Sequence, residues 1–252
     1  MTAARSCNST ARGCAVADGW FVTGTDTGVG KTLVAAALIV ALRRSGRRVA
    51  PMKPVAAGTE NGRCADVDTL MAASGGGFPP DLVNPYCFPD PIAPHVAAAR
   101  AGVRIAPERI VAAYRRLQAA ADAVVVEGAG GFRVPLGPAV DFADVAQQLG
   151  LPVILVVRIR LGCLNHALLT AEAVGRRGLA LAGWVANAVD PGMAAVRENV
   201  EALAERLPGP LLGEIPVLAD ADPAVAADRL QGFLPGAAQA PGGVASPLPP
   251  LD

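Results

Sequence analysis

Lysine is almost missing from this sequence of 252 residues. Of its 22 basic residues only Lys31 and Lys53 are lysines, and all the others are arginines. A lysine ammonium is a compact point charge, whereas an arginine guanidinium is a wide planar fork. The sequence uses arginine wherever a generic cation would serve. The two lysines are therefore candidates for positions that need a small positive charge in a confined space.

Other absences exclude whole classes of function. The formal net charge is zero, and no basic stretch carries interleaved aromatic residues, so a nucleic-acid-binding surface is not expected. No apolar run reaches the roughly 18 residues of a membrane span. The five cysteines lack metal-ligand spacing, and their odd number favours a reducing compartment. Residues 1–18 have no continuous apolar core like that of a secretory signal, so we expect a cytoplasmic protein.

Apolar strand-like runs alternate with helical segments, and this alternation predicts the fold class. The strands are solid apolar runs, as in a parallel sheet that is covered on both faces. The pattern predicts a doubly wound α/β fold with ligands at the carboxyl ends of the strands. Residues 1–18 are expected to form a disordered leader, 19–234 a single domain, and 235–252 a flexible Pro/Gly/Ala-rich tail. Strands are predicted near 20–24, 48–52, 123–127, 152–157, 181–187 and 211–215, and helices near 31–45, 66–73, 108–121, 141–149, 163–177, 193–207 and 223–230.

A glycine-rich loop connects the first predicted strand to the first predicted helix. Residues 24–32 read Gly-Thr-Asp-Thr-Gly-Val-Gly-Lys-Thr, and strand, loop and helix are the context that a phosphate-binding P-loop requires. Backbone N–H groups and the positive helix end would face the phosphates of ATP or GTP. Lys31 would reach the outer phosphates, and the Thr32 hydroxyl would bind Mg²⁺. Five residues, rather than the common four, separate Gly24 from Gly30, which points to one branch of the P-loop NTPases.

Acidic residues near other strand ends are candidates for the same site. Glu127 ends the apolar run 123–126, where an acid can hold the metal ion beside Thr32, and glycines after it keep the backbone open. Asp66 and Asp68 open a predicted helix, where N-capping would explain one of them. A helix start near the phosphates is also a good place for a third metal ligand.

Two further segments have open interpretations. Asn187 ends a later predicted strand, where its amide could contact a purine edge or cap a turn. Residues 161–166 follow the strand 152–157 and open a helix, and the exposed N–H groups at such a start would suit a carboxylate.

Taken in order along the chain, these segments resemble the dethiobiotin synthetase family. The ordered set, which spans roughly residues 20–230, is far more specific than any single block. The resemblance implies a single-domain fold of the P-loop NTPase type. The matching blocks are Phe21–Thr32, Lys53–Gly58, Asn84–Tyr86, Val126–Gly131, Leu161–His166, Gly183–Asn187 and Leu212–Pro216.

The resemblance implies a homodimeric ligase of biotin biosynthesis that forms C–N bonds. Its substrates would be 7,8-diaminopelargonate, CO₂ and MgATP. One amine would capture CO₂ as a carbamate, the carbamate would attack the γ-phosphate to give a carbamic–phosphoric anhydride and ADP, and the second amine would close the ureido ring and release phosphate. Because the nucleophiles belong to the substrate, the protein need only position groups and neutralise charge. The sequence accordingly has no Ser/His/Asp or Cys/His arrangement.

The resemblance also implies roles for individual residues. Lys31 and Lys53 would be catalytic, balancing charge on carbamate and phosphoryl oxygens. The Mg²⁺ ligands would be Thr32, Asp66 rather than Asp68, and Glu127. Nucleotide contacts are expected from Gly28, Val29, Gly30, Lys31, Thr32, Leu33, Asp66, Glu127, Gly128, Ala129, Gly130, Asn187, Pro216, Val217 and Leu218. Substrate contacts are expected from Thr27, Lys53, Ala57 and, across a dimer interface to the substrate carboxylate, the amides of Leu161, Gly162, Cys163, Leu164 and Asn165.

Three positions depart from the pattern of the family. Gly28 stands where many relatives carry glutamate, and Ala57 replaces a serine that can bond to substrate. Arg158 occupies a position often held by glycine, and it either helps to hold the substrate carboxylate or faces solvent.

A P-loop switch ATPase of the Min and Par partition type is the alternative. Those proteins carry a second lysine at the start of the loop, where this chain has Thr23 or Gly24. They also often end in an amphipathic membrane helix, a pattern that residues 235–252 lack.

Overall fold

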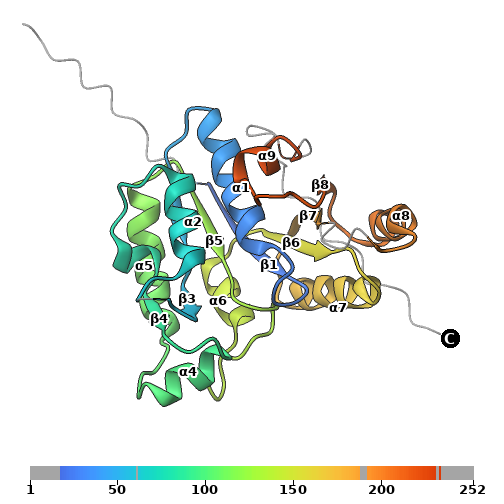
Figure 1. Ribbon diagram of the computed structural model, residues 1–252. Helices are drawn as coiled ribbons and strands as arrows, with labels where there is room; N and C mark the ends of the chain where they lie inside the picture. The colour runs from blue at the N-terminus through green and yellow to red at the C-terminus, as the bar shows by residue number, and fades with distance from the viewer. Residues whose placement is uncertain (1–17, 61, 188–191, 231–232, 234–252) are drawn as a thin grey trace, which may run out of the picture.

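The computed structural model describes residues 18–60, 62–187, 192–230 and 233, and its centre is a six-stranded parallel sheet (Figure 1). The strand order is β2-β5-β1-β6-β7-β8, and every neighbouring pair is parallel. The first strand lies inside the sheet, which extends from it in both directions. The doubly wound fold expected from the sequence is therefore confirmed. The strands are β1 (Asp18–Gly24), β2 (Val49–Met52), β5 (Ala123–Glu127), β6 (Val153–Arg158), β7 (Leu181–Asn187) and β8 (Leu211–Ile215).

Helices cover both faces of the sheet. Side chains of α1 (Lys31–Arg44), α2 (Ala65–Ser74) and α9 (Pro223–Ala227) share one buried cluster with one face of the strands. The other face packs against α5 (Pro107–Ala119), α6 (Phe142–Leu149), α7 (Cys163–Arg176) and α8 (Val196–Arg206). Successive strand residues alternate between the two faces. This burial on both sides is the reason for the solid apolar runs.

Four short elements between β2 and α5 were not predicted. They are β3 (Val55–Ala57), α3 (Pro80–Val83), β4 (Tyr86–Phe88) and α4 (Pro94–Arg100), and β3 pairs with β4 in a separate two-stranded parallel sheet. β3, α3 and β4 have only three or four residues, too few to show a helix or strand period. α4 has seven residues, which make only about two helical turns.

Some predicted boundaries were wrong by a few residues. Asp18 was expected to end the leader, but it is the first residue of β1 and pairs with Ala123. The helix expected from 193 begins at Val196, and the one expected to reach 230 ends at Ala227. The rest of the leader and the predicted tail lie outside the described residues. Within the part of the chain that the structure describes, no helix combines the length and apolarity that a membrane span needs.

Candidate active site

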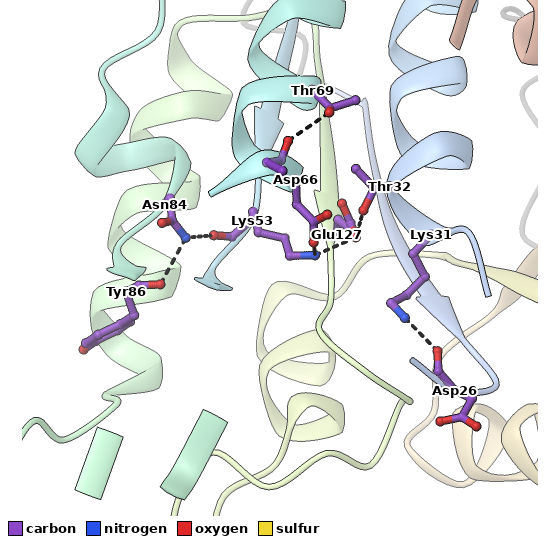
Figure 2. Close-up of polar contacts among 10 residues, drawn as sticks. Asp26, Lys31, Thr32, Lys53, Asp66, Thr69, Asn84, Tyr86 and Glu127 are labelled. Carbon is purple, nitrogen blue, oxygen red and sulfur yellow. Dashed lines mark hydrogen bonds and ion pairs between the residues drawn. The ribbon is translucent and has the colours of Figure 1, made fainter. Parts of the chain in front are cut away.

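The strand order brings three strand ends together at one edge of the sheet. β2, β5 and β1 are neighbours. Lys53 follows β2, Glu127 ends β5, and the P-loop follows β1. The carboxyl ends of parallel strands lie at the same edge, so groups far apart in sequence converge there. Figure 2 shows Lys31, Lys53 and Glu127 gathered in this way.

The P-loop is fixed in place by Gly30 and Asn187. Gly30, just before α1, has a φ of 93°, and a Cβ there would lie 2.0 Å from Asn187 Nδ2. Neither the backbone conformation nor the available space admits another residue. Asn187 Nδ2 donates to the carbonyl of Val29 at 2.9 Å. The end of β7 thereby holds the loop at the start of α1.

Lys53 lies between two carboxylates. Its Nζ donates to Glu127 Oε1 at 2.6 Å and to Asp66 Oδ2 at 2.8 Å. The Thr32 hydroxyl donates to the same Glu127 oxygen at 2.8 Å (Figure 2). Lys53 is 3% exposed and Glu127 1%. Asp68 instead pairs with Arg63, so Asp66 is the acid of α2 that reaches this cluster.

Asn84 holds the backbone of Lys53, and the sequence analysis missed this role. Its Nδ2 donates to the Lys53 carbonyl at 2.6 Å and to the Tyr86 carbonyl at 3.1 Å. The Lys53 amide donates to the Val83 carbonyl at 2.8 Å. Two elements too short to be predicted, α3 and β4, thus fix the start of the Lys53 side chain. The only signal in the sequence was the block Asn84–Tyr86.

The pKa values reflect two differently placed ammonium groups. Burial and the nearby Lys53 charge lower the pKa of Lys31 to about 8. Burial also acts against the charge of Lys53, but Glu127 and Asp66 outweigh it and raise the Lys53 pKa. The Lys31 Nζ donates to the Asp26 carbonyl at 2.8 Å. That contact leaves the Lys31 charge uncompensated by a carboxylate in hydrogen-bond range, as binding a phosphate requires.

The two acids have opposite shifts. Burial raises the pKa of Glu127 and outweighs the opposing Lys53 charge. Burial also acts to raise the Asp66 pKa, but hydrogen bonding and charge from Lys53 lower it overall. Asp66 is therefore the acid more firmly held as a carboxylate.

The residues at this point fit a magnesium ion. Glu127 Oε2 is buried and has no hydrogen-bond partner, and an unpaired buried carboxylate oxygen requires a partner. Among the described residues no group of three or more His, Cys, Asp or Glu side chains could hold a metal. Mg²⁺ does not need one, because it usually binds one or two carboxylates together with substrate phosphates and water. Thr32, Asp66 and Glu127 supply such a set.

A cavity of about 680 Å³ opens over this cluster. Its lining includes both lysines and the three expected metal ligands, together with apolar side chains such as Ile92 and Val134. These apolar lining residues were not predicted, because they come from segments without a motif. The expected site residues that line the cavity are Thr27, Gly28, Gly30, Lys31, Thr32, Lys53, Ala57, Asp66, Glu127, Ala129 and Gly130.

The other expected site residues lie elsewhere. Val29 is packed in the core, and Leu33 packs against the same cluster. A Cβ on Gly128 would touch Phe21. Pro216 lines a separate cavity of about 260 Å³ with Ile159 and Ala186. These residues and the remaining ones, Asn187, Val217, Leu218 and Leu161 to Asn165, do not line the main cavity of this chain.

A sequence-family model and curated relatives match nearly the whole described chain. Residues 18–225 match the family model described as AAA domain. The ATP-dependent dethiobiotin synthetase BioD of Aromatoleum aromaticum is 56% identical over 221 residues, which are 86% of this chain and 97% of that protein. The enzyme of the same name from Nitrosospira multiformis is 56% identical over 79% of this chain and 88% of its own length.

Comparison with solved structures identifies the fold alone. A chain of the MinC:MinD cell division protein complex from Aquifex aeolicus superposes with a TM-score of 0.53 at 15% identity, covering 84% of this chain and 89% of its own. That likeness shows a shared fold and gives no support to a partition function.

Proposed function

This chain belongs to the dethiobiotin synthetase family, and we propose that its cavity carries out the ATP-dependent synthesis of dethiobiotin. The observation that supports this most directly is the convergence of Lys31 and Lys53 with Thr32, Asp66 and Glu127 at one cavity. The substrates are 7,8-diaminopelargonate, CO₂ and ATP. The products are dethiobiotin, ADP and phosphate, and the enzyme is a cyclo-ligase that forms C–N bonds.

The triphosphate end of ATP lies on the P-loop. The N–H groups of residues 28–33 and the N-terminal end of α1 face its oxygens, and the glycines after Glu127 leave room beside them. Lys31 offers a charge whose hydrogen-bond partner among the described residues is the Asp26 carbonyl. Thr32, Asp66 and Glu127 would hold Mg²⁺, and the bound ion would neutralise charge on the outer phosphates.

The chain contributes charge and position to three chemical steps. One substrate amine attacks CO₂ and loses a proton, which gives a carbamate. A carbamate oxygen attacks the γ-phosphorus, the bond to ADP breaks, and a carbamic–phosphoric anhydride forms. The second amine attacks the anhydride carbon, phosphate leaves, and a proton is lost as the ring closes. Lys53 faces the carbamate and γ-phosphate oxygens, where negative charge develops, and Thr27 and Ala57 contact the diamine end.

Two further contacts complete the proposal. The side-chain nitrogen of Asn187 already donates to the Val29 carbonyl, so the side-chain oxygen is the atom it offers to the adenine. The adenine then lies beside residues 216–218, next to the small cavity that Pro216 lines. The amides of residues 161–165, which do not line the main cavity of their own chain, would hold the substrate carboxylate of a neighbouring subunit. This part of the proposal makes the enzyme a homodimer with shared sites.

One assay tests the function. The protein is incubated with diaminopelargonate, bicarbonate, Mg²⁺ and ATP, and dethiobiotin and phosphate are measured with each component omitted in turn. We expect equal amounts of both products, and neither when the diamine is left out. Phosphate release that continues without the diamine, with no dethiobiotin formed, would favour the P-loop switch ATPase.

A further inference from the structure

Arg158 is the last residue of β6, and its side chain has no hydrogen bond or ion pair to the residues that the structure describes. The side chain is partly buried, and its Nε is buried without any hydrogen-bond partner. No ion pair to another described residue is found for it. A buried N–H group that loses its hydrogen bond to water and gains no other acceptor destabilises the folded state. A ligand oxygen would supply the missing acceptor.

Strand alternation decides which face of the sheet Arg158 occupies. In β6, Ile154 and Val156 pack in the cluster that contains α1, whereas Leu155 and Val157 pack in the cluster that contains α7. Residues two apart on a strand share a face, so Arg158 lies on the α1 face. The carboxylate-binding segment proposed at the start of α7 lies on the opposite face. Of the two roles considered from sequence, the carboxylate contact is therefore disfavoured.

Arg158 sits between the P-loop and Asn187. It pairs in register with Asn187 of β7, and the Thr25 amide of the P-loop donates to the carbonyl of Val156, two residues before it. β6 lies next to β1 on the side away from β5 and β2 (Figure 1). Lys53 follows β2, Glu127 ends β5, and Asp66 contacts both from α2, so this part of the site, which would face the outer phosphates, lies on the β5 and β2 side. A nucleotide on the P-loop must then extend its inner phosphate and ribose over β6.

We propose that Arg158 binds the ribose and α-phosphate of ATP through its guanidinium. This inference rests on the proposed use of ATP at the P-loop. Arg158 does not line the cavity that contains Lys53, so its contact would be the same before and during phosphoryl transfer. It would raise nucleotide affinity without changing the chemical step.

The test is Arg158→Gln, with Arg115→Gln as the matched control, since Arg115 is exposed on α5 and its loss changes the net charge equally. ATP and ADP binding are measured by calorimetry, and dethiobiotin formation by steady-state kinetics. We expect ATP and ADP to bind about tenfold more weakly to Arg158→Gln, as for one lost hydrogen bond to a charged group. We expect KM for ATP to rise by the same factor, while kcat and KM for the diamine stay unchanged.

Three results would overturn the inference. The first is unchanged ATP and ADP affinity in Arg158→Gln while the wild-type protein forms dethiobiotin. The second is a rise in KM for the diamine alone, which would return Arg158 to the carboxylate. The third is a fall in kcat with a lowered Tm, which would indicate a structural role. If wild type forms no dethiobiotin but ATP affinity still depends on Arg158, the proposed function fails and the nucleotide contact stands.

Discussion

Lys53 is the buried cation of the proposed active site. Its ammonium is the buried partner of Glu127 and also contacts Asp66. We expect Lys53→Gln to lower kcat at least about 100-fold, as for removal of one preorganised charge from an active site. ATP affinity should change little, since the P-loop and Lys31 remain. Rapid-quench turnover and calorimetric ATP binding measure the two effects.

The same substitution leaves Glu127 buried without its counter-charge. Removing one partner of a buried pair is expected to lower the free energy of unfolding by on the order of 3 kcal/mol. The double variant Lys53→Gln/Glu127→Gln removes the fully buried unpaired carboxylate and leaves only the half-exposed Asp66 without its partner, so it should recover most of that stability in urea unfolding while turnover stays low. A double variant no more stable than Lys53→Gln would show that the pair is not a charged one.

The candidate site could be predicted from sequence wherever a motif fixes the backbone. The P-loop spacing placed Lys31 and Thr32, and the apolar run before Glu127 placed that acid at a strand end. The face occupied by Arg158 could not be predicted, because alternation gives two faces and only the tertiary packing of α1 and α7 distinguishes them. Asn84 was missed for a similar reason, since the carbonyls it binds, those of Lys53 and Tyr86, meet only through the packing of short elements that were not predicted.

At the scale of elements, α6 begins with a reciprocal cap. The Asp141 side chain accepts from the Asp144 amide, and Asp144 accepts from the Asp141 amide. Asp144 also pairs with Arg177 at the end of α7. Slight burial acts to raise the Asp144 pKa, but these hydrogen bonds and the Arg177 charge lower it overall.

Acid titration should reveal the contribution of Asp144. Its pKa is lower in the folded state, so between the folded value and the unfolded value near 3.9 the unfolded chain binds more protons, and stability rises with pH. The contribution is complete above about pH 5 and is lost as pH falls through the folded pKa. Asp144→Asn should be less stable at pH 7 in urea unfolding and should lose less stability on acidification. A free energy of unfolding that is lower than wild type by the same amount at every pH would contradict this.

Elements with an uninterrupted apolar run or a clear helical period were predictable, whereas the short elements between β2 and α5 were not. β5 and α1 have enough residues for a run or period to stand out, whereas β3 and β4 have three residues each. Those short strands take their conformation from pairing with each other and from the core beneath them, which is tertiary information.

At the scale of the whole molecule, the start of α7 is exposed in a single chain. Leu161 is 91% exposed and Leu169 56%, and Gly162, with a φ of 90°, sets the turn into the helix. Leu161 lies beside the N–H groups at the helix start, and Leu169 lies farther along the same helix. Their exposure fits the proposed dimer interface, which would deliver those N–H groups to a neighbouring cavity.

Shared sites predict that two inactive variants restore each other. Lys53→Gln damages the cavity of its own chain, whereas Gly162→Val strains the left-handed turn that its chain donates to the neighbour. In a mixed dimer, one of the two sites then combines an intact Lys53 with an intact α7 start. Random mixing makes half of the dimers mixed, so about a quarter of the wild-type activity should return.

The measurement uses two differently tagged variants, refolded together, with each alone as a control. Both homodimers must bind ATP, which separates a damaged site from a misfolded chain. Native mass spectrometry establishes that mixed dimers form, and dethiobiotin production is followed in the same samples. Mixed dimers without recovered activity would mean that each chain builds its whole site alone, and the amides of residues 161–165 would then have no part in binding the substrate.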